Sequence, residues 1–366
     1  MRGSTSQQVP MLSVLTPEQL VPEDHPLRRI KVIVDRALAE LSPVFDEMYA
    51  ANGRASIPPE RLLKGCLLIA LYSIRSERQL CEQLQYNLLF KWFMDMDVET
   101  PAFDATTFTK NRDRLLSHEV APRFVQAVLA QAKSARLISV EHFSVDGTLL
   151  EAWASLKSFQ PRDATDHRPR GGTGGTRNPD VDFRGKPRRN DTHVSTTDPE
   201  ARLFTKGLHQ TAKLCYSGNV LMENRHGLVV DVVVVPASGR AERETALRML
   251  RRHGAAGRRR TVAADKAYDT EEFVNGCRAL KVTPQVARNI TRYRGSHIDD
   301  RSAARPGYVV GQRVRKRVEE IFGWVKTVGG GRKLRYIGVE RNQLWAELTT
   351  TAYNLVRMSK LLASPV

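Results

Sequence analysis

The sequence predicts an α/β protein in which an all-helical N-terminal domain precedes a core built on a mixed sheet. Two patterns along the chain lead to this prediction. Residues 24–135 repeat apolar side chains at helical spacing, whereas from residue 140 onward short strand-like runs alternate with helical segments. A third observation is charge, because the 366 residues carry a formal net charge of +17. This excess of basic side chains predicts a polyanionic partner, with nucleic acid favoured over a membrane surface.

The hydropathy of the chain argues against a membrane protein. No apolar run approaches the roughly 20 residues that a membrane-spanning helix needs. The first residues contain no apolar signal core, so we expect a cytoplasmic protein, associated with the bacterial nucleoid. The four cysteines show no Cys-x-x-Cys spacing, which makes a zinc knuckle an unattractive interpretation.

The N-terminal part divides into a flexible arm, residues 1–23, and a helical domain, residues 24–135. Helices are expected to begin near Pro26 and near Pro59, since the first N–H groups of a helix are unpaired in any case. Ser76, followed three residues later by a glutamine, predicts a capping box and a further helix. Short helices with basic outer faces suit a small DNA-binding domain, and a packing or dimerising bundle is the alternative.

The elements of the second part, residues 138–362, are predicted from apolar runs and turn residues. Strands are expected at 142–146, 209–217, 227–235, 261–265 and 282–287, and helices at 242–252, 271–280, 313–327 and 340–361. Ser217 to Asn219 supply turn residues, and Asp269 is expected to cap a helix. A stretch rich in Gly and Arg at about 160–195 holds too few apolar residues for a core, so we expect a disordered loop there.

Asp146 and Asp265 come at the ends of two predicted strands. Ligands of open α/β sheets bind at the carboxyl ends of the strands. If these strands are neighbours, the two carboxylates lie side by side, which is costly unless a cation separates them. Mg²⁺ and Mn²⁺ suit such all-oxygen sites, and two ions can promote in-line displacement at phosphorus.

Glu319 is the third candidate, and it lies in the most basic part of the chain. Residues 301–335 contain ten Lys or Arg side chains and only two acidic ones. Arg315 precedes Glu319 by four residues and Lys326 follows it by seven, so all three lie near one face of a helix. Such a face would hold phosphates beside a metal site. A solvated helix with ion pairs between successive turns is the alternative.

Several segments, in the same order, resemble bacterial insertion-sequence transposases of the IS5 family, which belong to the DDE group. Tyr72 to Leu80 and Asp104 to Arg114 resemble the N-terminal helical domain of that family. Val145 to Thr148 resembles the segment of its first catalytic Asp, and Ala264 to Asp269 resembles that of its second. The resemblance covers nearly the whole chain.

The third acidic segment is similar to the family signature Tyr-x2-Arg-x3-Glu-x6-Lys. Arg315, Glu319 and Lys326 match its last three positions, whereas Gln312 stands at the Tyr position. Ala267 also replaces a glycine that often follows the second Asp. The Tyr is not a metal ligand in the family, so we do not expect Gln312 to disable the site, and the change at Ala267 is mild.

The resemblance implies an RNase H-like fold, two divalent ions (Mg²⁺ or Mn²⁺) and DNA strand cleavage followed by strand transfer. Asp146, Asp265 and Glu319 would be the catalytic metal ligands. The partner would be double-stranded DNA, both the inverted-repeat ends and the target, bound by a homodimer when two ends are paired. The basic residues expected to contact DNA are Arg315, Lys326, Lys316, Arg317, Lys266, Lys213 and Arg112.

Two other functions stay open at this point. One is a stand-alone nuclease of the same fold, which cuts without joining. The other is a DNA-binding protein descended from a transposase that has lost activity, although all three acidic residues are present. Trp153 and Trp324 are candidates either for stacking on a displaced base or for ordinary packing.

Overall fold

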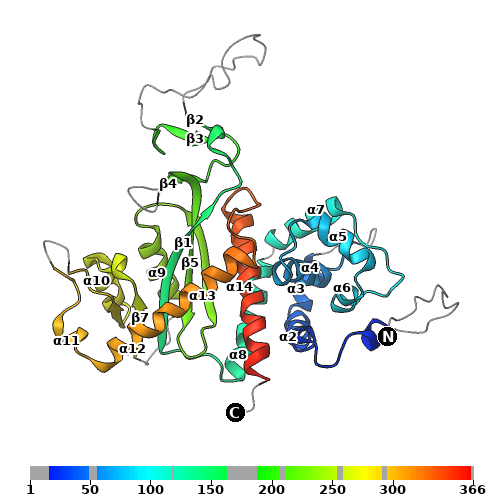
Figure 1. The fold of residues 1–366 in the computed structure, drawn as a ribbon, viewed down its shortest axis with the longest axis horizontal. Coiled ribbons are helices and arrows are strands. Elements are labelled where there is room, and N and C mark those ends of the chain that lie inside the picture. The colour runs from blue at the N-terminus through cyan, green and yellow to red at the C-terminus, as the bar shows by residue number, and fades with distance from the viewer. Residues whose placement is uncertain are drawn as a thin grey trace, which may run out of the picture.

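A computed structural model describes residues 16–48, 56–117, 119–162, 188–205, 211–253, 259–290 and 295–363. A bundle of short helices lies on one side of the long C-terminal helix, and a mixed sheet lies on the other (Figure 1). Residues 1–15 of the predicted arm and residues 163–187 of the predicted disordered loop are outside the described residues. Within them, no helix is both long and apolar enough to cross a bilayer.

The N-terminal region is helical, as predicted. Its helices are α1 Pro17–Leu20, α2 Pro26–Glu40, α3 Ser42–Met48, α4 Pro59–Leu71, α5 Glu77–Tyr86, α6 Leu88–Phe93, α7 Ala105–Ser117 and α8 Val120–Ser134. The prediction of a flexible arm is wrong for α1, because Glu18 pairs with Arg28 and accepts a hydrogen bond from the Trp92 indole. These polar contacts, rather than apolar burial, hold α1 against α2 and α6.

The predicted helix caps are present with one change. The Ser76 hydroxyl accepts a hydrogen bond from the Gln79 N–H at 3.1 Å. The Gln79 side chain accepts from the Arg75 N–H at 2.9 Å, so the reciprocal half of the capping box is shifted by one residue. Asp104 accepts from the first backbone N–H groups of α7.

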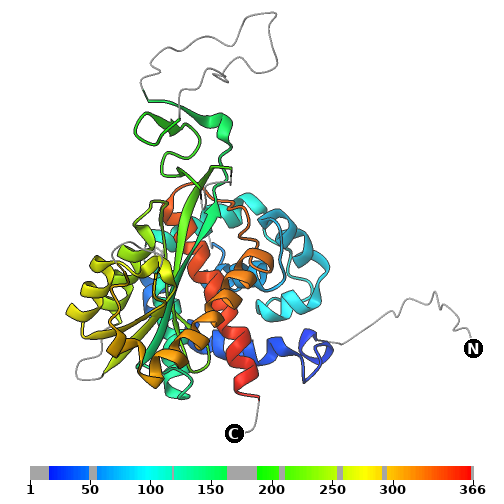
Figure 2. The ribbon, with the colours of Figure 1, turned by 60° about the vertical axis from the view of Figure 1, so that its left-hand side comes forward.

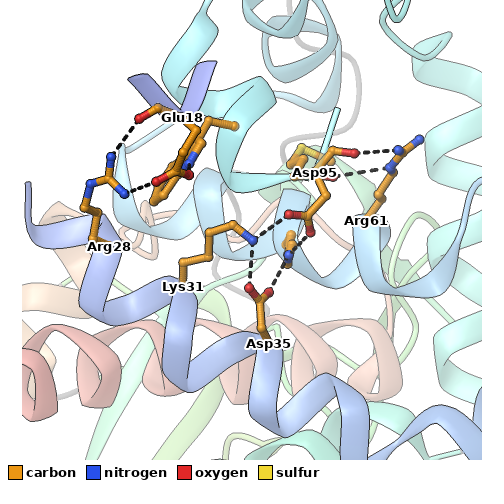
Figure 3. A network of polar contacts seen from close by, with 9 residues as sticks. Glu18, Arg28, Lys31, Asp35, Arg61 and Asp95 are labelled. Atoms are coloured by element: carbon orange, nitrogen blue, oxygen red, sulfur yellow. Dashed lines mark hydrogen bonds and ion pairs between the residues drawn. The ribbon is translucent and has the colours of Figure 1, made fainter. Parts of the chain in front are cut away.

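A cluster of alternating charges joins α2, α4 and the segment after α6 (Figure 3). Lys64 is only 2% exposed, and its ammonium lies between Asp95 and Asp35, the latter at 2.5 Å. Lys31 bridges the same two carboxylates at 2.7 Å and 2.5 Å. Burial by itself would raise the pKa of Asp95, but hydrogen bonds from Lys31 and Lys64 outweigh it and lower that pKa.

The described residues form a six-stranded mixed sheet and a separate two-stranded pair. The strands of the large sheet are β1 His142–Glu151, β4 Arg202–Phe204, β5 Lys213–Glu223, β6 Val229–Pro236, β7 Arg260–Ala264 and β8 Val282–Val286, and those of the pair are β2 Phe159–Pro161 and β3 His193–Ser195. The main order is β4-β5-β1-β7-β8, and β6 shares the edge of β5 with β4.

The pairing in the large sheet identifies the fold. β5 is antiparallel to both β1 and β6, whereas β1, β7 and β8 are parallel to one another. An antiparallel three-stranded meander extended by two parallel strands, with β1 at the junction, is the RNase H-like arrangement. The predicted fold class, an RNase H-like mixed sheet behind a helical N-terminal region, is therefore confirmed.

Helices cover both faces of the sheet (Figure 2). The remaining helices are η1 Leu156–Ser158, α9 Ala241–Arg252, η2 Lys266–Tyr268, α10 Glu271–Ala279, α11 Asp300–Ala303, α12 Pro306–Val314, η3 Arg315–Arg317, α13 Val318–Thr327 and α14 Val339–Leu361. α9 and α10 join the core that contains Phe143 and Val145 of β1, and α13 joins the core that contains Leu150. Alternate residues of β1 therefore face different helices.

α14 connects the two parts of the molecule. It packs on β6 and also on α2, α4 and α8 of the helical region. One continuous hydrophobic cluster extends from Leu62 in α4 through Leu348 in α14 to Val262 in β7. The helical region and the sheet thus share a core, although their secondary structures change abruptly near residue 140.

Two local predictions differ from the structure. Ser217 to Asn219 lie in the middle of β5 and do not form a turn, because Gly218 packs under the side chain of Leu150. The turn comes after β5 instead, where the buried Glu223 carboxylate accepts hydrogen bonds from the backbone of Arg225 and His226. The predicted helix over 313–327 is interrupted by the 3₁₀ turn η3 between α12 and α13.

Candidate active site

The sheet brings Asp146 and Asp265 together at the same level. β1 and β7 are parallel, and Ser144 is paired with Ala263 in their register. Asp146 and Asp265 each come two residues after that pair, where β7 has just ended at Ala264, so the register brings the two residues to the same level of neighbouring strands. The prediction that a strand ends in a carboxylate holds for Asp265, which directly follows β7, but it is wrong for Asp146, because β1 continues five residues beyond it.

Backbone N–H groups orient both carboxylates, which are half-buried. Oδ1 of Asp146 accepts from the N–H of Gly147 at 2.8 Å. Oδ1 of Asp265 accepts from the N–H of Ala267 at 2.8 Å, as the cap of the 3₁₀ turn η2. Such hydrogen bonds limit the rotation of each side chain.

Glu319 is exposed on the first turn of α13, which runs beside β1. Nζ of Lys326, near the end of α13, donates to Oγ1 of Thr148 at 2.5 Å. Before α13 begins, the Arg317 guanidinium donates to the carbonyls of Asn224 and Arg225, and that turn is bonded to the start of β1. Glu319 therefore lies on the stretch of helix between these contacts, alongside the part of β1 that carries Asp146.

The two aspartates fit a divalent cation. Their donors are all oxygen, and Mg²⁺ is usually held by one or two carboxylates, with water and substrate phosphate completing its shell. Glu319, the third predicted ligand, does not complete a three-residue cluster with the two aspartates. In the described part of the chain, no three His, Cys, Asp or Glu side chains converge closely enough to hold a metal ion together. A site composed of Asp146, Asp265 and Glu319 stays a prediction.

Tyr268 is a neighbour of both aspartates that the sequence did not single out. It is 1% exposed, and its hydroxyl has no hydrogen-bond partner among the described residues. Burial raises the pKa of Tyr268 well above its usual value. The negative charges of Glu242, Asp146 and Asp265 raise that pKa further, so all three carboxylates lie near the phenol.

Gln312, which stands at the Tyr position of the family signature, orients Arg315. Its amide donates to the carbonyl of Gln285 in β8 at 2.5 Å. Its oxygen accepts from Nε of Arg315 at 2.9 Å. Gln312 therefore connects the basic segment to the sheet by hydrogen bonds. Arg315 is positioned near the strand ends although glutamine stands at the Tyr position of the family signature.

The other basic residues predicted to contact DNA fall into two groups. Lys266 and Lys316 are exposed, and Lys316 belongs to the turn η3. Lys213 is 58% exposed, but it forms a 2.6 Å ion pair with Glu151, whose hydrogen bond raises the Lys213 pKa. Lys213 is therefore already paired within the sheet.

Arg112 requires a correction. It is only 5% exposed, and its guanidinium pairs with Glu77 and, at 2.8 Å, with Asp113. It also lies 4.5 Å above the ring of Tyr336. Arg112 is thus a buried link between α5, α7 and the segment before α14, and it does not present a surface charge to DNA. Helical spacing placed it on the basic outer face, but that side of α7 packs against the rest of the molecule.

The two candidate stacking residues differ. Trp324 is half-buried and packs edge-on against Tyr353, with ring centroids 5.9 Å apart. Trp153 is 53% exposed just after β1, and Nζ of Lys333 lies 5.8 Å from the centre of its ring. Packing explains Trp324, whereas Trp153 remains on the surface beside a cation.

Two family models match this chain. Residues 15–114 match a transposase domain described as DUF772, and residues 191–355 match a transposase DDE domain. The first match covers most of the helical region, and the second covers the sheet from β3 onward. Asp265 and Glu319 lie within the second match, whereas Asp146 precedes it.

Comparisons with other proteins add little. The search of curated proteins found no match. Among solved structures, a piggyBac transposase synaptic complex with hairpin DNA is similar over 93% of this chain and 77% of that one, at 10% identity and a TM-score of 0.43. A Mos1 strand transfer complex is similar over 84% and 81%, at 8% identity and a TM-score of 0.20. The strand order therefore identifies the fold, and the two family matches identify the similarity to transposase domains. Residues 15–114 are thus similar to a transposase domain of the DUF772 type, and residues 191–355 are similar to a transposase DDE domain.

Proposed function

We propose that this protein is a DNA transposase of the IS5 type. It binds the terminal inverted repeats of an insertion sequence, cuts DNA strands at the repeat ends and joins them to a target. Asp146, Asp265 and Glu319 are its catalytic residues and hold two divalent cations, Mg²⁺ or Mn²⁺. Bound at this position, such ions activate the attacking oxygen and stabilise the leaving oxygen at phosphorus. Two copies of the chain act together when two ends are paired.

One observation carries the proposal: Asp146 and Asp265 share one level on neighbouring parallel strands, and the second lies inside a transposase DDE domain. Burying two like charges near one another costs free energy unless a cation compensates them. The arrangement therefore favours an active enzyme over an inactive DNA-binding descendant.

The basic segment around α13 supports a phosphate backbone as the substrate. Arg315 is oriented by Gln312, and Lys326 reaches the strand that carries Asp146. Lys316 and Arg317 lie between them, on the same turn before Glu319. Positive charges on both sides of a carboxylate site would hold the phosphates that flank the cut, while the backbone contacts supply binding without sequence readout.

The experiment is strand cleavage and joining by the purified full chain on DNA carrying the inverted repeats that flank its gene. Each reaction contains Mg²⁺ or Mn²⁺ and is compared with one containing EDTA. We expect metal-dependent cuts at the repeat ends and joined products. Cutting without joining would instead identify a stand-alone nuclease. Binding to the repeats without cutting in either metal would identify an inactive descendant.

A further inference from the structure

Helix α12 is held against β8 by one of its faces. The Tyr308 hydroxyl donates to the carbonyl of Val286 at 2.9 Å, and the Gln312 amide donates to the carbonyl of Gln285 at 2.5 Å. Gly311 belongs to the same face, and a Cβ added to it would collide with the side chain of Gln285. Glycine therefore allows α12 to approach β8 closely, and these contacts determine which face of the helix is directed away from the strand.

The opposite side of α12 combines apolar and basic side chains. Val309 is 59% exposed, and Val310 beside it is 58% exposed. Arg305, Val309 and Arg313 follow one another at intervals of four residues, so they lie along one side of the helix, and both arginines are exposed. Lys316, which is exposed in the turn η3, continues this line. These five residues form the outer face of α12.

Two neighbouring exposed valines add little to the stability of a helix. Their exposed surface contributes no hydrophobic stabilisation, and a β-branched side chain slightly lowers the helix propensity. Single apolar residues scattered over a surface need no explanation, whereas adjacent ones rimmed by polar residues mark interaction sites. The outer face of α12 is of the second kind, because basic side chains surround its two valines.

The charges around the valines favour nucleic acid as the partner. Residues 301–318 contain six Lys or Arg side chains and no Asp or Glu. A polyanion neutralises these charges, whereas an apolar protein surface would leave them uncompensated. In addition, α12 leads through the basic turn η3 directly into α13, which carries Glu319 of the proposed active site (Figure 1). The outer face of α12 therefore extends the basic segment that we propose to hold phosphates.

The spacing of the two arginines fits a groove of duplex DNA. Arg305 and Arg313 are eight residues apart, which corresponds to about 12 Å along a helix that rises about 1.5 Å per residue. The major groove of B-DNA is about 12 Å wide and admits an α-helix. One arginine at each side of the groove can then reach a phosphate. The valines between them would face the base edges, where the methyl group of thymine offers an apolar contact.

We propose that the outer face of α12 lies in the major groove of the DNA bound at the active site. Its two arginines contact phosphates on the two strands, and its two valines contact the bases between them. The proposal rests on the proposed function and adds an interaction surface to it. Because α12 leads through η3 to Glu319, the DNA that it holds is the duplex next to the cut.

The test compares Val309→Asp with Val98→Asp in the full chain. Val98 is 45% exposed between Asp97 and Glu99, where the acidic neighbours make contact with DNA unfavourable. Both substitutions therefore add one negative charge at an exposed valine, and only one of them does so in the proposed interface. Gel shifts at one fixed salt concentration measure the affinity for duplex DNA that carries the inverted repeat flanking the gene. Thermal midpoints show that each variant is folded.

We expect Val309→Asp to weaken binding to this DNA by about 10- to 100-fold, because like charges that face each other across an interface repel strongly. Val98→Asp should bind as the wild type does. Unchanged affinity of Val309→Asp, with a wild-type thermal midpoint, overturns the proposal.

Arg313→Ala tests the phosphate contact without adding a charge to the groove. Loss of one phosphate contact should make the slope of log affinity against log salt shallower by about 0.9. Arg123→Ala is its control, because Arg123 is exposed on α8, outside the basic segment. The same slope for the two variants contradicts the assignment of Arg313 to a phosphate and overturns the proposal.

The mass of the DNA-free chain distinguishes DNA from a second copy of the chain as the partner of α12. Sedimentation of the wild type and of Val309→Asp should give equal masses. A larger wild-type assembly that Val309→Asp dissociates would show that a second copy covers this face, and the proposal would be wrong. If the wild type binds no repeat DNA, the proposed function itself is wrong, whereas equal binding by the wild type and Val309→Asp removes only the role of α12.

Discussion

Two clusters of charged side chains in this protein differ in the signs of their charges. In the helical region, Lys64 and Lys31 alternate with Asp35 and Asp95, so every charge has an opposite neighbour within the fold (Figure 3). At the sheet edge, Asp146, Asp265 and Glu242 lie near the buried phenol of Tyr268, whose hydroxyl has no hydrogen-bond partner among the described residues. The first cluster is complete without a ligand and serves stability. The second is the place where we propose that divalent cations bind.

This difference distinguishes a buried ion-pair network from the site that we propose to be functional. Arg112 belongs to the first kind, since Glu77 and Asp113 surround its buried guanidinium. Asp146 and Asp265 belong to the second kind, because their strand register brings like charges together. Four predictions break or sharpen this comparison, from the largest expected effect to the smallest.

Asp265→Asn should have the largest effect, and on activity rather than folding. Losing a metal ligand removes several kcal/mol of transition-state stabilisation, so we expect cleavage to fall about a thousandfold or more. Binding to the repeat ends should persist, because it depends on phosphate contacts elsewhere. Gel-shift and cleavage assays on the same DNA measure both. Normal cleavage by this variant would show that the metal site is assigned wrongly.

The double substitution Asp35→Asn and Asp95→Asn tests the paired cluster. It leaves the ammonium of Lys64, which is 2% exposed, without a carboxylate. We expect the free energy of unfolding to fall by roughly 3 kcal/mol, the lower end for a broken buried pair because both aspartates are partly exposed. Urea denaturation measures this loss.

Asp46→Asn, at an exposed position of α3, is the control for that experiment and should change stability little. The pH dependence supplies a second check. Because the pKa of Asp95 is lowered in the folded state, its stabilisation is present above its unfolded pKa of about 4 and is lost as the pH falls below that value. A double variant as stable as the wild type would remove the distinction between the two clusters.

Glu347 offers a third case for comparison with the two clusters, because it is a half-buried carboxylate on α14 outside both of them. Burial raises its pKa to about 7, although a hydrogen bond from Gln343 opposes that rise. The raised folded pKa means that stability falls as the pH rises from about 4.5 to above 7. Glu347→Gln should flatten this dependence, with a gain of roughly 1–2 kcal/mol at pH 8 relative to pH 5.5. Parallel pH profiles of unfolding free energy for the two proteins would contradict the assignment.

Lys316→Ala should have the smallest effect, since its side chain is exposed. If it contacts one phosphate, the slope of log affinity against log salt becomes shallower by about 0.9, with no change in thermal midpoint. Arg112→Met should do the reverse, lowering the thermal midpoint and leaving the slope unchanged. A shallower slope for Arg112→Met, with wild-type stability, would restore Arg112 to the DNA-binding surface.

Much of the fold was predictable because its determinants are local. Apolar spacing and caps such as Ser76 defined the helices, and the apolar run before Asp265 was recognisable as a strand that ends next to a carboxylate. Local signals failed where a distant neighbour decided the outcome. Ser217 to Asn219 have turn residues, yet they form the centre of β5, because a glycine was needed under Leu150.

Residue roles were harder to predict than elements, for the same reason. Asp269 was expected to cap a helix, but Thr270 caps α10, and the Asp269 carboxylate accepts from the backbone N–H groups of Asn289 and His297. Arg112 lies on the basic stripe of its helix, yet α5 and the segment before α14 cover it. In both cases the partner is remote in sequence, so spacing carries no information about it.

The sequence by itself determined the charge of this protein, the type of each long element and the acidic residues at Asp146, Asp265 and Glu319. These follow from side-chain chemistry and from patterns a few residues long. Only the tertiary structure decided that β1 and β7 pair in a register that aligns the two aspartates, and that α12 packs on β8 through Gly311 and leaves Val309 exposed. Register and close approach depend on how sheet and helices pack together, and that packing is a property of the whole chain rather than of any segment.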